Sequence, residues 1–84
     1  MHSNDVTLYN AGTGQHVRLN RIEVQGVLRR RLLDLGFVPG NVIEVLQRSP
    51  LGDPIAFRVN NTTIALRKEE STLMYGEIVG GDNE

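Results

Sequence analysis

The side chains that most often carry chemistry in proteins are scarce in this sequence. There is no cysteine, which excludes disulfides, thiolate metal sites and thiol catalysis. The two histidines, His2 and His16, stand apart from each other and from any pair of carboxylates, so they predict no histidine-based metal site. Ser49, Ser71 and Thr72 have no neighbouring base that could activate a hydroxyl. The sequence therefore favours a protein that is not an enzyme.

Two further groups could contact an ion or a phosphate, and neither is complete. Glu69 and Glu70, or Asp82 and Glu84 in the tail, could bind a divalent cation weakly, but a dedicated site needs about six converging oxygens. The turn Gly12-Thr13-Gly14 lacks the third glycine, the lysine and the following helix of a phosphate loop. We therefore predict neither a metal site nor a cofactor.

The sharpest charged feature is the run of three arginines from Arg29 to Arg31. On a helix, three consecutive residues spread over about 200°, so a solvated helix face is the simpler interpretation. Nucleic-acid binding by a small β-barrel needs a basic groove with aromatic stacking platforms. The chain has only two tyrosines and two phenylalanines, of which Phe57 alternates toward the core. We therefore predict no nucleic-acid partner.

The totals describe one small domain with almost no net charge. Its 84 residues allow one modest core and no deep cleft between lobes. The net charge of −1 provides no field that would draw the chain to nucleic acid or to an anionic membrane. Neither a signal peptide nor a run of ~18 apolar residues is present. We expect a cytoplasmic protein, folded over residues 6–79, with disordered ends at 1–5 and 80–84.

The spacing of leucines predicts a short amphipathic helix. On a wheel of roughly 100° per residue, Leu32 and Leu35 fall within about 40° of Leu28 and form one apolar stripe. Gly36 follows at the position where a left-handed residue closes a helix, so the helix should end at Leu35 or Gly36.

The next four residues, 38–41, have the signature of a type II turn. Pro39 occupies the second position and Gly40 the third, which requires a positive φ. A strand should begin at about Asn41. We therefore expect Gly36, Pro39 and Gly40 to be structural turn residues.

Leu33 departs from the leucine stripe. It falls at about 140° on the wheel, beside Arg29 and with Arg30 further round. Either the small barrel surrounds enough of the helix to bury Leu33, or Leu33 is an exposed leucine among arginines, which suits a partner surface. Leu32 is ambiguous too, because a stripe residue at the edge of a barrel can be partly exposed.

Alternating apolar residues predict the strands. Within residues 14–26 the parity changes at Asn20-Arg21, where one extra residue predicts a β-bulge. Further strands are expected at Val42–Arg48, Ile55–Val59, Thr62–Leu66 and residues 73–79. Residues 60–61, both asparagine, predict a two-residue hairpin loop, because asparagine tolerates positive φ. Residues 6–11 predict an irregular or single-turn segment, and residues 68–72 a single helical turn. The residues expected to face the core are Ile55, Phe57, Val59, Ile64 and Leu66.

These elements predict an all-β fold. Short strands, tight turns and one early helix in this length indicate a strongly bent antiparallel sheet closed on itself. We expect a small SH3-like barrel of about five antiparallel strands, with the helix between the first two strands. The loop at residues 49–54 should be rigid, because two prolines and a glycine restrict its backbone.

Four motifs stand in order along the chain: Leu28-Arg-Arg-Arg-Leu-Leu-Asp-Leu-Gly-Phe-Val-Pro-Gly40, Val42-Ile-Glu-Val45, Pro50-Leu-Gly-Asp-Pro54 and Ala65-Leu-Arg-Lys-Glu-Glu70. Together they resemble the ferrous-iron transport protein A family (FeoA), and the match covers roughly residues 6 to 79. The domain is also similar to the C-terminal SH3-like domain of iron- and manganese-dependent repressors. Residues 9–12, Tyr-Asn-Ala-Gly, depart from the family's usual Pro-Gly turn.

The resemblance implies a small cytoplasmic accessory of ferrous-iron transport. Its partner would be FeoB, a membrane-embedded transporter with a cytoplasmic GTPase domain, so the chain would reach the membrane only through FeoB. A domain standing alone favours this accessory role over the alternative, a metal-responsive or protein-binding module of the repressor type. Weak homo-oligomerisation is compatible with both hypotheses.

We expect the contact surface for the transporter to combine the arginine side of the helix with the 49–54 loop. The leucine stripe is committed to the core, which leaves a leucine among arginines for a partner. A loop fixed beforehand by its prolines loses little entropy on binding. The predicted partner-binding residues are Arg29, Arg30, Leu32, Leu33, Pro50, Leu51, Gly52, Asp53 and Pro54.

Overall fold

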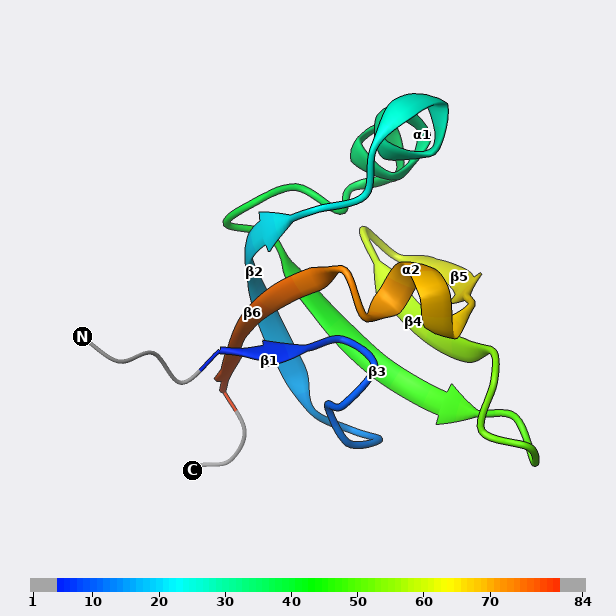
Figure 1. Cartoon of the computed structure of the whole chain (residues 1–84). Helices are drawn as coiled ribbons and strands as arrows, with labels where there is room; N and C mark the ends of the chain where they lie inside the picture. The colour runs from blue at the N-terminus through cyan, green and yellow to red at the C-terminus, as the bar shows by residue number, and fades with distance from the viewer. Residues whose placement is uncertain (1–4, 81–84) are drawn as a thin grey trace.

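The computed structural model describes residues 5–80, which form six strands and two helices (Figure 1). The expected disordered ends at 1–5 and 80–84 lie almost entirely outside these residues. In chain order the elements are β1 (Val6–Thr7), β2 (His16–Ile22), α1 (Gly26–Leu35), β3 (Val42–Arg48), β4 (Ile55–Val59), β5 (Thr62–Leu66), α2 (Lys68–Ser71) and β6 (Met74–Val79).

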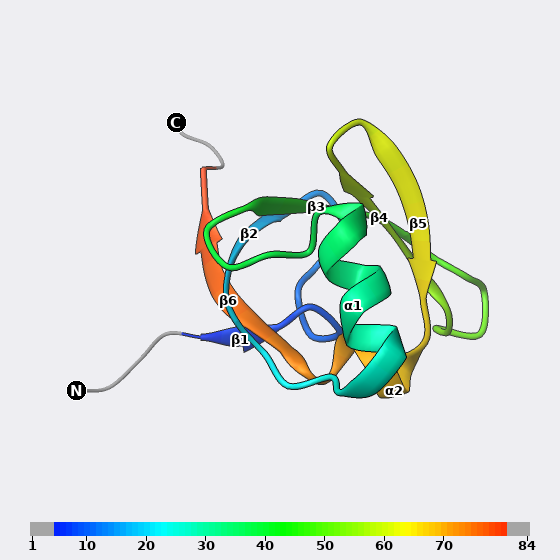
Figure 2. The same cartoon turned by 90° about the horizontal axis from the view of Figure 1, so that it is seen from above.

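All six strands belong to one antiparallel sheet with the order β1-β6-β2-β3-β4-β5. The sheet bends around a single core, and α1 lies across one end of it (Figure 2). Two expectations need correction. The sheet is open, because β1 and β5 are its two edges. The helix lies between the second and third strands, because the two-residue β1 precedes the strand that we expected to be first.

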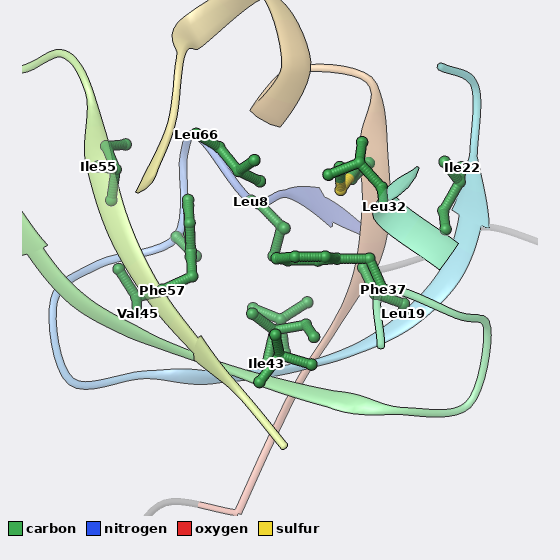
Figure 3. Packing of buried hydrophobic residues seen from close by; sticks show 14 of the residues in the cluster. Leu8, Leu19, Ile22, Leu32, Phe37, Ile43, Val45, Ile55, Phe57 and Leu66 are labelled. Carbon is green, nitrogen blue, oxygen red and sulfur yellow. The ribbon is translucent and has the colours of Figure 1, made fainter. Parts of the chain in front are cut away.

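The core is built from the inward side chains of β2, β3, β4, β5 and β6, from Leu32 of α1 and from residues of the connections. Phe37 and Phe57 are fully buried, and Figure 3 shows Phe57 between Val45 and Ile55. The alternation of β4 is confirmed, since Ile55, Phe57 and Val59 are buried. On β5, Leu66 is buried as expected, whereas Ile64 only packs against the core from its edge.

Three local predictions are confirmed by the backbone. The register between β2 and β6 shifts between Leu19 and Arg21, which places the bulge where the apolar parity changes. Asn60 and Asn61 have φ angles of 51° and 65°, the left-handed pair that a two-residue hairpin needs. The single helical turn expected at residues 68–72 is α2.

Residues 8–11 are more deeply buried than their sequence indicated. Leu8 and Ala11 are core residues, although the apolar spacing of residues 6–11 is too loose to predict a strand or a helix. The segment is held by Arg48 of β3, whose Nη2 donates hydrogen bonds to the carbonyl oxygens of Tyr9 and, at 3.1 Å, of Ala11. The Arg48 guanidinium also lies 5.2 Å from the centre of the Tyr9 ring. Arg48 is therefore a structural residue that fastens the N-terminal segment to the sheet.

We expect Arg48→Met to lower the free energy of unfolding by about 2 kcal/mol, because two part-buried carbonyl groups lose a charged donor. The apolar stem is kept, so the change reports on the guanidinium. The measurement is chemical denaturation followed by circular dichroism. Arg58→Met is the matched control: Arg58 is 3.6 Å from Glu44 in an exposed ion pair, and its loss should cost no more than about 0.5 kcal/mol. Equal midpoints for the two variants would contradict the anchoring role.

Candidate functional site

The helix α1 is the most prominent element that the sheet does not enclose, and three contacts fix its position. Leu32 is 2% exposed and reaches into the core near Phe37 (Figure 3). Arg29 Nη1 donates a 2.9 Å hydrogen bond to the carbonyl oxygen of Ile22 at the end of β2. Gly36 closes the helix with φ 115°, as predicted. These contacts orient α1 so that one side faces the core and the opposite side faces solvent.

The turn after α1 ties the helix to the rest of the sheet. Gly40 has φ 94°, and Asn41 N donates to Val38 O at 3.0 Å, so residues 38–41 form the expected tight turn. Asn41 Nδ2 donates to the Gly36 carbonyl oxygen at 2.7 Å. The end of the helix therefore has a fixed place relative to β3.

The solvent side of α1 carries Val27, Arg30, Arg31 and Asp34, and we call these four residues the outer face. They follow the i, i+3, i+4, i+7 spacing of one helix face, whose centre lies roughly 120° from the leucine stripe on the wheel. Val27 is 81% exposed, so this face presents one apolar side chain to solvent. Sequence reasoning missed Val27, Arg31 and Asp34 as surface candidates, although the same wheel that placed the leucines contained this signal.

Two shallow hollows flank the outer face. One of ≈ 340 Å³ is lined by Gly26, Arg29, Arg30, Leu33 and Asp34. The other, of ≈ 260 Å³, is lined by Val27, Arg30, Arg31, Asp34 and Leu35. Arg30 and Asp34 form the ridge between them. The linings of both hollows therefore combine apolar side chains with guanidinium groups.

The two ambiguous leucines are now placed. Leu33 is half-buried: it packs against the core and still lines the larger hollow, so it combines both interpretations that the sequence left open. Leu32 is a core residue. The prediction that it contacts a partner is wrong, because its side chain has almost no accessible surface. Leu28 and Leu35 are only half-buried, so the stripe is less completely enclosed than predicted.

The 49–54 loop forms a second exposed feature. Its backbone is closed by hydrogen bonds from Ser49 N to Pro54 O at 3.0 Å and from Gly52 N to Ser49 O at 2.8 Å. Asp53 Oδ1 accepts a 2.9 Å hydrogen bond from Lys68 N, so Asp53 caps α2 as well as facing solvent. Leu51 is 94% exposed at the tip. The loop thus presents one apolar side chain on a hydrogen-bonded turn.

The structure does not bring the helix and the loop together. Figure 1 shows α1 at the top of the molecule and the β3–β4 loop at its lower right, and Figure 2 also separates them. The predicted partner-binding residues therefore lie in two separate parts of the molecule. The predicted residues divide into a helix set, Arg29, Arg30 and Leu33, and a loop set, Pro50, Leu51, Gly52, Asp53 and Pro54.

The described residues offer little for metal chemistry or membrane insertion. Within residues 5–80, no three histidine, aspartate or glutamate side chains gather closely enough to hold a metal ion. His2, Asp82 and Glu84 lie outside that range. Over the same range, no helix has the length and apolar character needed to cross a membrane.

Comparison with known proteins identifies the family. The model of the FeoA domain matches residues 6–78, which is most of the chain. The chain belongs to the FeoA domain family. This confirms the resemblance carried by the helix, turn and loop motifs. The FeoA family is associated with ferrous-iron transport.

Two similar proteins, one curated sequence and one solved structure, are both named as iron transport proteins. The Fe(2+) transport protein A/Fe(2+) transporter FeoB fusion protein of Porphyromonas gingivalis is 36% identical over 70 residues, which cover 83% of this chain and 8% of the relative. The solution structure of iron(II) transport protein A from Clostridium thermocellum is 45% identical with a TM-score of 0.84, and the match covers 90% of this chain and 47% of that one. The chain thus spans less than half the length of either relative.

A second solved structure confirms the fold class. The crystal structure of Stenotrophomonas maltophilia FeoA complexed with zinc, described as an SH3 domain protein, has a TM-score of 0.70. At 23% identity, covering 86% of this chain and 96% of that one, the likeness concerns the fold alone. Together with the sheet order, it makes this FeoA domain an SH3-like β domain.

Proposed function

We propose that this FeoA domain is an accessory of ferrous-iron transport that acts by binding a FeoB-type transporter on its cytoplasmic face and modulating it. The observation that carries the proposal is the Porphyromonas gingivalis relative, in which an Fe(2+) transport protein A and the transporter FeoB are fused in one chain. Fusion makes the encounter of two modules intramolecular, whereas separate chains must recognise each other through a surface. The protein therefore works through binding rather than catalysis.

The surface that we assign to the transporter is the solvent side of α1 with the larger hollow. It combines the apolar side chain of Leu33 with the guanidinium of Arg30, and arginine is a residue type that binding centres favour. Arg29 borders the same hollow but also holds the helix to Ile22. The loop set around Leu51 is the competing surface, and because it lies elsewhere on the molecule, the two can be tested separately.

We expect Leu33→Gln to weaken binding to full-length FeoB of the same organism by about tenfold. The reason is that the substitution replaces an apolar lining residue of the larger hollow with a polar amide. Leu51→Gln makes the same chemical change on the loop and should leave binding nearly unchanged. Affinity is measured by biolayer interferometry with detergent-solubilised transporter, after circular dichroism has shown that each variant is folded. If only Leu51→Gln impairs binding, the loop is the contact surface and the assignment to α1 is wrong.

The alternative function, a metal-responsive module of the repressor type, is tested with the same preparation. An anaerobic calorimetric titration with ferrous iron is run on the chain alone. A tight, stoichiometric iron site together with no affinity for the transporter would replace the accessory role with the sensing role.

A further inference from the structure

The two arginines of the outer face have no neutralising partner. Within residues 5–80, the guanidinium groups of Arg30 and Arg31 form no ion pair or hydrogen bond, and Asp34, the one carboxylate of α1, forms no ion pair with them. Three arginines of the sheet, by contrast, each pair with a glutamate at 2.7–3.6 Å: Arg18, Arg21 and Arg58. Positive charge is therefore left available on α1, although the whole chain has a net charge of −1.

This charge borders apolar surface on both sides. Arg30 lies between a hollow with Leu33 in its wall and a hollow with Val27 and Leu35 in its wall. When an apolar side chain of a partner enters either hollow, the residues next to it in the partner lie close to the guanidinium of Arg30. Groups that accept hydrogen bonds and carry negative charge are the ones favoured there.

We propose that the transporter segment that binds α1 is acidic and amphipathic, with carboxylates facing Arg30 and Arg31 and one apolar side chain in the hollow beside Leu33. The inference rests on the proposed function and adds the chemistry of the partner. Because the chain is nearly neutral overall, the attraction is local and reaches about 8 Å at physiological ionic strength. Charge therefore selects the segment once the two proteins are close, and repels basic segments from the same site.

The test compares charge reversal at two positions with the same change in net charge. Arg30→Glu alters the outer face, and Arg67→Glu alters an exposed residue that lies outside α1, just before α2. Binding of each full chain to detergent-solubilised full-length FeoB is measured in 50 mM and in 500 mM NaCl. We expect Arg30→Glu to weaken binding about tenfold in low salt, because repulsion replaces attraction, whereas Arg67→Glu stays close to the parent. Between 50 mM and 500 mM NaCl, the parent and Arg67→Glu should each lose affinity several-fold. The loss of affinity for Arg30→Glu over the same range should be much smaller.

The outcomes separate this inference from the proposed function. One outcome excludes the acidic partner and leaves the accessory role standing. In it the parent binds FeoB, the affinity does not change with salt, and Arg30→Glu binds as well as Arg67→Glu. If Arg30→Glu binds more tightly than the parent, the segment is basic and the inference is overturned. If the parent shows no affinity at either salt concentration, both the inference and the proposed function fail. Arg30→Lys keeps the charge and should retain most of the affinity, which a merely structural role of Arg30 would not require.

Discussion

Gly36→Ala should lower the free energy of unfolding by about 3 kcal/mol, because the residue meets two separate obstacles. Its φ of +115° is a conformation that side chains with a Cβ rarely adopt, which costs about 1–2 kcal/mol. The added Cβ would also lie 2.4 Å from Asn60 Nδ2 and 2.8 Å from Val59 Cγ2. Asn60 can turn away, but Val59 is buried in the core, so the helix end must move off the β4–β5 hairpin.

Gly40→Ala is the matched control for this prediction. Gly40 also has a positive φ, of +94°, but a Cβ there would meet no atom within 4 Å. In this variant only backbone strain should lower the free energy of unfolding, by about 1–2 kcal/mol. Urea denaturation of both variants beside the parent measures the difference. Equal losses at the two glycines would show that crowding at Gly36 contributes nothing and that the hairpin does not limit the helix end.

Gly76→Ala should destabilise the domain by about 3 kcal/mol or more through crowding alone, since overpacking typically costs 1–3 kcal/mol and the nearest atom here is backbone. A Cβ on Gly76 would lie 2.2 Å from the carbonyl oxygen of Arg18 and 2.7 Å from Val17 Cγ1. Gly76 faces Leu19 on β2 and Val6 on β1, so it lies in β6 between two paired strands. Accommodating a methyl group requires β2 and β6 to separate.

The control for Gly76→Ala is Glu77→Ala, the next residue of the same strand. Glu77 is half-exposed, and its Oε2 lies 2.9 Å from Arg18 Nη1 in an ion pair. Removing this ion pair should lower the free energy of unfolding by no more than about 0.5 kcal/mol. Thermal and urea denaturation of both variants provide the comparison. A Gly76→Ala variant as stable as Glu77→Ala would mean that β2 and β6 are not held at this spacing in solution.

The sequence by itself determined the parts of the fold whose conformation depends on near neighbours. The helix end at Gly36, the turn at Pro39-Gly40 and the hairpin at Asn60-Asn61 each follow from the φ angles that one or two residue types allow. The β2 bulge follows from a change of apolar parity within one strand. On the candidate site, the same local logic separated Leu32 and Leu35 from Arg29 and Arg30.

Only the tertiary structure decided which residues meet across the chain. Leu8, Gly76 and Arg48 have their roles because the fold brings β1, β2, β3 and β6 together, and nothing within a few residues of each one encodes that meeting. The same reason explains why the predicted partner surface divided: residues 29–33 and 50–54 are each well formed locally, but the sheet order places them at different ends of the molecule. Local conformation is fixed by sterics over one to four residues, whereas the distance between two surface segments is fixed by strand pairing and by how a shared core is filled.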